Sequence, residues 1–180
     1  MEGRERLRLF VALLLPEPAL SRLSDWQHRE LAHARGLRVV PRANLHVTVA
    51  FLGSTERAEL ASIAAVVRSA AQTVQPPVFD PLRYRETRSV GMIVLADEGG
   101  RATTVAERVF DGLEGLDVYR REPREWLPHV TVVRFRERPR LTPSLPQAGP
   151  LVSSEMAVMM SRLRPSGAQY DVLESVPLGG

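Results

Sequence analysis

One short pattern, His-x-Thr-x, occurs twice in the chain and holds the residues best suited to chemistry. The first copy contains His46 and Thr48, and the second contains His129 and Thr131. Both copies lie in apolar, β-branched runs, which predicts a strand in each place. Side chains alternate along a strand, so the histidine and the threonine of each copy share one face. Two such strands lining one cleft provide two proton-transfer groups and two hydrogen-bond donors, which is enough for acid–base chemistry at a phosphate.

A structural interpretation of these histidines competes with the functional one. A lone histidine in a strand is usually a hydrogen-bonded structural residue, and one copy of so short a pattern arises by chance. Two copies are much rarer, and they use two of the four histidines in the chain. The repetition favours a functional role for His46 and His129, whereas His28 and His33 are expected on the surface of a helix or in its packing.

The length and composition indicate one domain across residues 1–180, built as a single unit or as two small lobes that share a core. With 44% hydrophobic residues, the chain is expected to be globular. No apolar run is long enough to span a membrane, and the short run 9–15 is predicted to be a buried strand. The chain has no cysteine, which excludes disulfides, thiolate metal sites and a cysteine nucleophile and favours the cytoplasm.

All 24 basic residues are arginines, because the chain has no lysine. This excludes the lysine–nucleotide intermediate of ATP-dependent nucleic-acid ligases and the phosphate loop that requires Gly-Lys-Ser/Thr. Arginine instead offers planar, bidentate donors for phosphate. The net charge of +3 favours an anionic partner only slightly, since a solvated, arginine-rich surface explains it equally well.

Hydrophobic periodicity and the positions of proline and glycine predict the elements that must position the two motifs. The expected strands are residues 6–14, 37–40, 45–52, 81–86, 90–96, 130–135, 154–163 and 169–176, and the expected helices are residues 19–35, 55–73 and 102–113. Gly53 is expected to end the first motif strand, and Ser54 or Thr55 to cap the second helix. The charged segment 117–128 is predicted to be a loop, and the segment 136–150 to be an exposed loop.

The order of these elements suggests an architecture for the whole chain. Each half of the chain, divided near Pro76, holds one His-x-Thr-x strand. This predicts an α+β fold of two pseudo-symmetric lobes, each with an antiparallel sheet and helices, in which the motif strands face a central cleft.

With these residues identified, the chain resembles the 2H phosphoesterases. The block 38–53 around the first motif is similar to that of the family almost throughout, and Trp126 and Arg134 match positions that flank the second motif. Residues 7–12 and 167–178 resemble the opening and closing segments of the family. Within it, the chain is most similar to the bacterial 2′-5′ RNA ligase and RNA 2′,3′-cyclic phosphodiesterase group. It departs from that group at Val39 and Arg42, where an aromatic and an acidic residue are usual.

The resemblance implies hydrolysis of a 2′,3′-cyclic phosphate at an RNA 3′ end to a 2′-phosphate, with no metal and no cofactor. Reversal of the same steps joins a cyclic end to a 5′-hydroxyl through a 2′-5′ bond without ATP. The family pattern makes His46 the general acid and His129 the general base, although the residues alone leave the two roles open. Thr48 and Thr131 are expected to donate hydrogen bonds to the phosphate oxygens.

Two further residues are candidates for substrate binding. Arg134 is suited to a bidentate phosphate contact, but strict alternation places it on the face opposite His129, so a bulge or a twist is required. Trp126 is either a base-stacking residue or a core or lid residue. The same alternation places Phe51 in the core. Three arginines before the second motif are expected either to follow an RNA backbone or to be solvated: Arg120, Arg121 and Arg124.

Two alternative functions stay open. One is 2H activity on a small cyclic nucleotide or on a 2′-5′-linked oligoadenylate. The other is a non-catalytic RNA-binding module, which the two intact motif histidines disfavour because a binding protein needs neither imidazole. The expected partner is RNA or a small cyclic nucleotide, with no membrane and no obligate protein partner.

Overall fold

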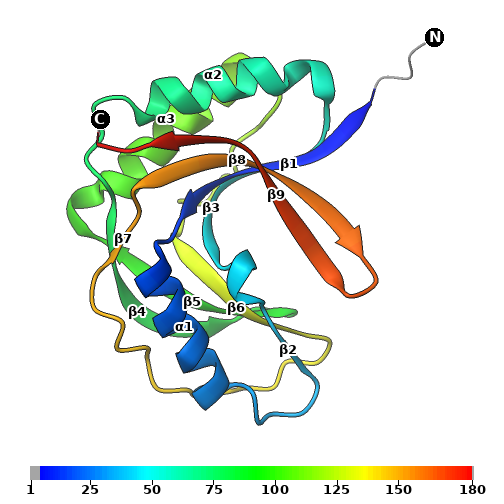
Figure 1. The fold of residues 1–180 in the computed structure, drawn as a ribbon, viewed down its shortest axis with the longest axis vertical. Coiled ribbons are helices and arrows are strands. Elements are labelled where there is room, and N and C mark those ends of the chain that lie inside the picture. Colours follow the sequence, from blue (N-terminus) through cyan, green and yellow to red (C-terminus); the bar gives the residue numbers. More distant parts are fainter. Residues whose placement is uncertain (1–4, 180) are drawn as a thin grey trace.

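The computed structural model describes residues 5–179, which form an α+β fold built on a curled antiparallel sheet (Figure 1). The strands are β1 (Arg6–Leu14), β2 (Leu37–Val39), β3 (His46–Glu56), β4 (Val78–Glu86), β5 (Val90–Asp97), β6 (His129–Phe135), β7 (Leu151–Val152), β8 (Glu155–Arg164) and β9 (Gly167–Pro177). The helices are α1 (Glu17–Glu30), α2 (Leu60–Ala71) and α3 (Arg101–Gly115). The predicted fold class is therefore confirmed.

The two motif strands lie next to each other at the centre of the sheet. The strand order is β7-β4-β5-β6-β3-β1-β8-β9, and β2 pairs with residues 133–135 of β6, beyond the point where β3 pairs with it. Strands β3 and β6 share one register pair, Val47 with Val130, so this junction divides the sheet into two lobes. Because the motif strands form the junction, their functional faces meet where the lobes meet.

The lobes are not the two halves of the chain. Strand β2 comes from the first half but pairs with β6, and β8 and β9 come from the second half but lie beside β1. The division near Pro76 is therefore not a lobe boundary. Each lobe is completed by strands that are distant in sequence, which non-local strand pairing allows and element order alone does not reveal.

Helices α2 and α3 pack against each other at one end of the molecule, while α1 lies beside the other lobe (Figure 1). The buried face of α3 repeats at helical spacing, with Val105, Val109 and Leu113 fully enclosed. A Cβ at Gly112 would lie 2.5 Å from Val66 Cγ1, so glycine is required for this close approach of the two helices.

Several predicted boundaries differ from the structure, among them the start of β4, which begins at Val78 instead of residue 81. Strand β3 does not end at Gly53 but continues to Glu56, so Ser54 and Thr55 belong to the strand and α2 begins at Leu60. Pairing with β1 explains the extension, since the Arg6 guanidinium donates to Ser54 Oγ (2.9 Å) and to its carbonyl (2.6 Å). Helix α1 ends at Glu30 instead of continuing to residue 35.

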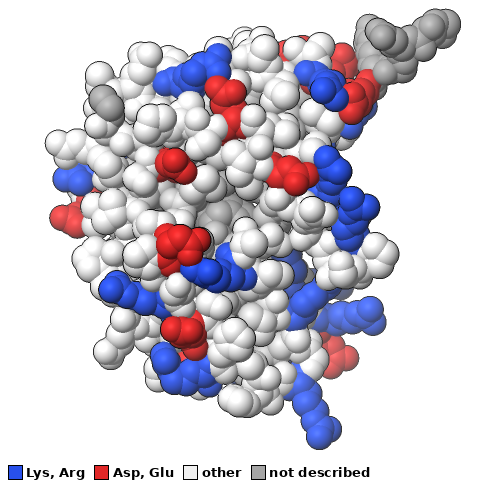
Figure 2. Space-filling view, viewed as in Figure 1, with Lys and Arg blue, Asp and Glu red and all other residues white. Residues whose placement is uncertain are grey.

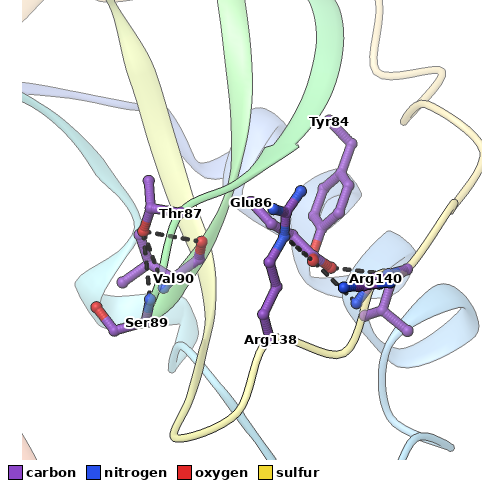
Figure 3. Close-up of polar contacts among 8 residues, drawn as sticks. Tyr84, Glu86, Thr87, Ser89, Val90, Arg138 and Arg140 are labelled. Atoms are coloured by element: carbon purple, nitrogen blue, oxygen red, sulfur yellow. Dashed lines mark hydrogen bonds and ion pairs between the residues drawn. The ribbon is translucent and has the colours of Figure 1, made fainter.

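The segment 136–150 is a loop without regular structure, and most of its residues are exposed, as predicted, but hydrogen bonds tie it to the fold. The buried Glu86 carboxylate accepts hydrogen bonds from Tyr84 Oη (3.1 Å), the Arg138 guanidinium (3.2 Å) and the backbone amides of Arg140 (2.9 Å) and Leu141 (2.8 Å) (Figure 3). Burial raises the pKa of Glu86, but these four hydrogen bonds outweigh it and the net shift is downward.

Helix α1 holds the far end of the same segment. The Trp26 indole donates to the Ser144 carbonyl at 2.6 Å, and the Arg22 guanidinium donates to the Ala148 carbonyl at 2.5 Å. The sequence predicted the loop and its exposure but not this attachment, because long-range contacts leave no pattern in the local sequence. Within the described residues, no helix is long and apolar enough to cross a membrane.

Candidate active site

A cavity of about 610 Å³ lies at the junction of the two lobes and contains both motifs. His46 and Thr48 reach it from β3, and His129 and Thr131 reach it from β6. Arg134, at the end of β6, lines the same cavity, whereas Trp126 lies in a neighbouring one. The structure thus brings five of the six sequence-predicted site residues together.

The two histidines are oriented by the same contact. His46 Nδ1 lies 2.8 Å from the Asn44 carbonyl, and His129 Nδ1 lies 2.7 Å from the Leu127 carbonyl, in each case two residues earlier in the chain. A carbonyl oxygen can only accept, so Nδ1 of each ring carries a proton and donates it. Nε2 is therefore the nitrogen left for proton transfer in both motifs. In the free protein, His46 Nε2 accepts from Thr48 Oγ1 at 2.8 Å.

The surroundings of His46 favour its neutral form. Its ring packs against Phe10 and Tyr170, with ring centroids 5.1 Å and 5.4 Å away. The pKa of His46 is lowered to about 4, mainly by burial; the hydrogen bond to the Asn44 carbonyl opposes this shift, and the charges of His129 and Arg134 add to it. In the free protein His46 is therefore neutral at pH 7, and an anion bound beside it would raise its pKa.

A bulge in β6 brings Arg134 onto the same face as His129. Thr131 pairs with Met92 and Val133 pairs with Gly91, which leaves Val132 as an extra residue in β6. Val132 and Val133 are consequently both buried, and Arg134 is exposed toward the cavity. The sequence placed Arg134 on the opposite face unless such an irregularity occurs, and the irregularity is present.

A matching bulge in β3 overturns the prediction for Phe51. Thr48 pairs with Ala12 and Ala50 pairs with Val11, so Val49 is the extra residue. Phe51 then lies in the cavity with 49% of its surface exposed, not in the core.

Phe51 and Arg134 each follow their motif histidine by five positions, so they occupy equivalent places in the two motifs. The signal that could have found both is the pair of adjacent apolar residues after each threonine motif, Val49-Ala50 and Val132-Val133. Two consecutive buried residues in a strand indicate a break in alternation.

Side-chain donors bind the carbonyls beside both bulges. The buried Gln27 amide donates to the carbonyl of Val132 (2.8 Å) and to that of Val40 (3.0 Å). The Trp126 indole donates to the Thr48 carbonyl at 3.1 Å. Gln27 was not singled out from the sequence, because a glutamine on an amphipathic helix has no distinguishing pattern.

The cavity is strongly positive. Four arginines and no acidic residue line it, the arginines being Arg8, Arg38, Arg134 and Arg164. In Figure 2, blue side chains gather between the β8–β9 hairpin and β2. Arg38 stands directly opposite Arg134 in the β2–β6 register, and among residues 5–179 neither forms an ion pair. Like charges placed opposite each other are unfavourable unless an anion lies between them.

A cation–π contact lies at one side of the cavity. Arg8 lies over the Phe51 ring, with its guanidinium carbon 4.7 Å from the ring centroid. Between residues 5 and 179, no three His, Cys, Asp or Glu side chains form a group able to hold a metal ion. Two imidazoles and several guanidiniums line the cavity, so it can hold an anion between them.

Comparisons with known proteins match the chain to one family of phosphoesterases. A family model described as LigT-like phosphoesterase matches residues 13–80. An RNA 2′,3′-cyclic phosphodiesterase of Thermus thermophilus is 30% identical over 97% of this chain and 91% of its own length. A second protein of that name, from Methanocaldococcus jannaschii, is 24% identical over 93% of this chain and 99% of its own length.

Solved structures show the same fold. TT0787 of Thermus thermophilus has a TM-score of 0.82 and 29% identity, with 97% of this chain and 99% of that chain covered. LigT of E. coli in its apo form has a TM-score of 0.76 and 20% identity, with 97% and 98% covered.

A two-lobed α+β fold with a histidine from each lobe in one cavity defines a phosphoesterase of the two-histidine class. The chain belongs to the LigT-like phosphoesterases of the 2H superfamily. It is an enzyme, a hydrolase that acts on phosphodiester bonds.

Proposed function

We propose that the chain is an RNA 2′,3′-cyclic phosphodiesterase that leaves a 2′-phosphate. The observation that carries this proposal is the placement of two Nε2 atoms, His46 and His129, in one arginine-lined cavity without a carboxylate. The names of the Thermus and Methanocaldococcus relatives support the substrate.

The proposed reaction uses His129 as general base and His46 as general acid. Water attacks the phosphorus, a new phosphorus–oxygen bond forms, and the proton of the water goes to His129 Nε2. The bond from phosphorus to the 3′-oxygen breaks, and His46 Nε2–H gives its proton to that oxygen. The products are a 2′-phosphate and a free 3′-hydroxyl. Reversal of these steps, with an RNA 5′-hydroxyl in place of water, forms a 2′-5′ bond.

The bound phosphate supplies the charge that this assignment requires. His46 is neutral in the free protein, and an anionic phosphate beside it opposes the effects of burial and of the neighbouring positive charges on its pKa. Once Nε2 is protonated it no longer accepts from Thr48, so the Thr48 hydroxyl is free to donate to a phosphate oxygen.

Thr131 and Arg134 complete the proposed phosphate site from β6. Arg134 provides the bidentate donors, and Thr131 provides a hydroxyl on the same face as His129. Trp126 acts in this proposal as a support of β3 through its bond to the Thr48 carbonyl.

A small cyclic nucleotide is the second candidate substrate, because a cavity of about 610 Å³ is of the size that holds a small molecule. We also propose that residues 1–180 form one domain, which the continuous sheet supports. The absence of cysteine supports the cytoplasm as its compartment.

The decisive experiment gives the purified protein a short RNA that ends in a 2′,3′-cyclic phosphate and identifies the product. A 2′-phosphate end is the expected result. A 3′-phosphate end would contradict the proposed bond cleavage. Turnover of nucleoside 2′,3′-cyclic monophosphates alone would favour the small-nucleotide function.

A further inference from the structure

A second cavity of about 760 Å³ opens directly beside the first. The two share Thr48, Phe51 and His129, so one of the two motif histidines lies at their junction, while His46 lines only the first cavity. The second cavity extends away from β2, over β4 and β5, and is bordered by residues of the segment 117–128. A substrate larger than one nucleotide can therefore continue from the first cavity into the second without leaving the surface.

The sheet register places two arginines of β4 on the catalytic face. Arg83 pairs with Val94, which pairs with His129, and Arg85 pairs with Met92, which in turn pairs with Thr131. Residues paired directly across antiparallel strands project from the same face of the sheet. Arg83 and Arg85 are therefore two strands from the motif side chains, a distance of about 10 Å at the usual strand spacing.

These two arginines are free to bind a ligand. Among residues 5–179, neither Arg83 nor Arg85 forms an ion pair or a side-chain hydrogen bond, and both are exposed. Their positive charges repel those of the neighbouring anion-binding cavity, and a bound polyanion would neutralise this repulsion.

Most arginines that the segment 117–128 contributes to the second cavity already form ion pairs. Arg121 is held by Glu107 (2.6 Å), Glu114 (3.1 Å) and Asp111, and Arg124 is held by Glu122 at 2.6 Å. Of the three arginines expected from the sequence either to follow RNA or to be solvated, only Arg120 forms no ion pair within the described part of the chain. The available positive charge of this cavity therefore lies mainly on β4.

Aromatic side chains accompany the free arginines. Phe51, Tyr119 and Trp126 line the cavity, and Phe51 borders both cavities. Positive charge that follows a backbone, combined with aromatic faces for the bases, is typical of sites for single-stranded nucleic acid.

We propose that the second cavity binds the RNA chain upstream of the terminal cyclic phosphate, with Arg83 and Arg85 contacting its backbone phosphates. This inference rests on the proposed function, since it requires the terminal phosphate to lie between His46 and His129. It makes the enzyme selective for polynucleotide ends over cyclic mononucleotides, which have no upstream phosphate.

The test compares two substrates and two matched double variants. The substrates are a five-nucleotide RNA with a 2′,3′-cyclic end and the nucleoside 2′,3′-cyclic monophosphate of its last residue. The variant Arg83→Gln/Arg85→Gln removes two positive charges inside the second cavity. The control Arg35→Gln/Arg136→Gln removes two charges from exposed arginines that line neither cavity.

The expected result is a change in selectivity. The β4 variant should raise KM for the oligonucleotide about tenfold more than KM for the mononucleotide, and should reduce the salt dependence of oligonucleotide binding by about one to two phosphate contacts. The control should leave the ratio of the two KM values as in the wild type.

An equal change for both substrates, no change for either, or the same change in the control would overturn the inference. These outcomes are separate from failure of the proposed function. If the wild-type protein hydrolyses neither substrate, the proposed function and the inference both fall. If it hydrolyses both substrates and the β4 variant has the wild-type KM ratio, only the inference is lost.

Discussion

The motif histidines are oriented by their own strands. In each motif, the carbonyl two residues earlier accepts the Nδ1 proton and leaves Nε2 in the cavity. This contact is local, so the short pattern carries with it both the side chain and its orientation. The two imidazoles are thereby matched in tautomer although they come from different lobes.

Replacing either motif histidine by alanine is expected to lower kcat for cyclic-ended RNA by about 100-fold or more, because each variant loses one proton-transfer group. Steady-state kinetics and thermal unfolding of His46→Ala and His129→Ala would measure activity and fold together. His33→Ala is the control, since His33 is exposed and lines neither cavity. A folded His46→Ala or His129→Ala variant with wild-type kcat would rule out the two-histidine reaction.

The pKa of His46 provides a test of the proposed anion site. Its pKa of about 4 lies below the ordinary value of 6.5, because burial disfavours the charged ring. A histidine NMR titration should show one ring that titrates near pH 4 in the free protein and at higher pH after inorganic phosphate is added. The signal should be missing from His46→Gln. A His46 signal that titrates at its ordinary value, or that phosphate leaves unchanged, would contradict the proposed role of the bound anion.

The same shift links His46 to stability. The unfolded chain binds a proton at His46 more readily than the folded protein does. The contribution of the neutral ring to the free energy of unfolding is therefore fully present above pH 6.5 and is lost as the pH falls toward 4. Between pH 7 and pH 4 the free energy of unfolding should fall by about 2–3 kcal/mol less in His46→Gln than in the wild type.

At the scale of the element, the two bulges are the features that assemble the cavity. Each adds one residue after its motif and turns the fifth residue after the histidine into the cavity. Gln27 reaches one of them from α1 and binds the Val132 carbonyl. A helix of one lobe thus holds the irregularity that brings Arg134 into the cavity.

Gln27→Leu is expected to lower the free energy of unfolding by about 1–3 kcal/mol, because two buried carbonyls lose their amide donor. It should also raise KM more than it lowers kcat, since Arg134 loses its fixed position while both histidines stay. Urea unfolding and steady-state kinetics would separate the two effects. Gln75→Leu, at an exposed position, is the control. A Gln27→Leu variant with unchanged KM would show that the bulge does not depend on this amide.

At the scale of the whole molecule, the two lobes complete each other. Strand β2 is contributed to the β6 lobe from the first half of the chain, and β8 and β9 are contributed to the β1 lobe from the second half. Neither lobe is a continuous piece of chain, so neither is expected to fold without the other. The cavity at the junction consequently exists only in the intact protein.

Equilibrium unfolding in urea should therefore show one transition. Tryptophan fluorescence and far-ultraviolet circular dichroism are expected to give the same midpoint, because lobes that each take strands from both halves of the chain unfold together. Two midpoints that differ between the probes would show that the lobes unfold separately and would contradict the single-domain proposal.

Local patterns in the sequence were enough to predict the features that depend on neighbouring residues. The alternation of His46 with Thr48 and of His129 with Thr131, the absence of lysine and cysteine, and most strand and helix positions follow from local patterns. Periodicity reports which side chains share a face, and it does so wherever a strand is regular.

The features that depend on distant partners became visible only in the folded protein. The bulge residues Val49 and Val132 are recognised by their pairing with β1 and β5, and that pairing places Phe51 and Arg134 in the cavity. Strand register likewise explains the continuation of β3 past Gly53. It also aligns Arg83 of β4 with His129 of β6 through Val94 of β5. Register is set between strands that are far apart in the chain, so it has no counterpart in any local stretch of sequence.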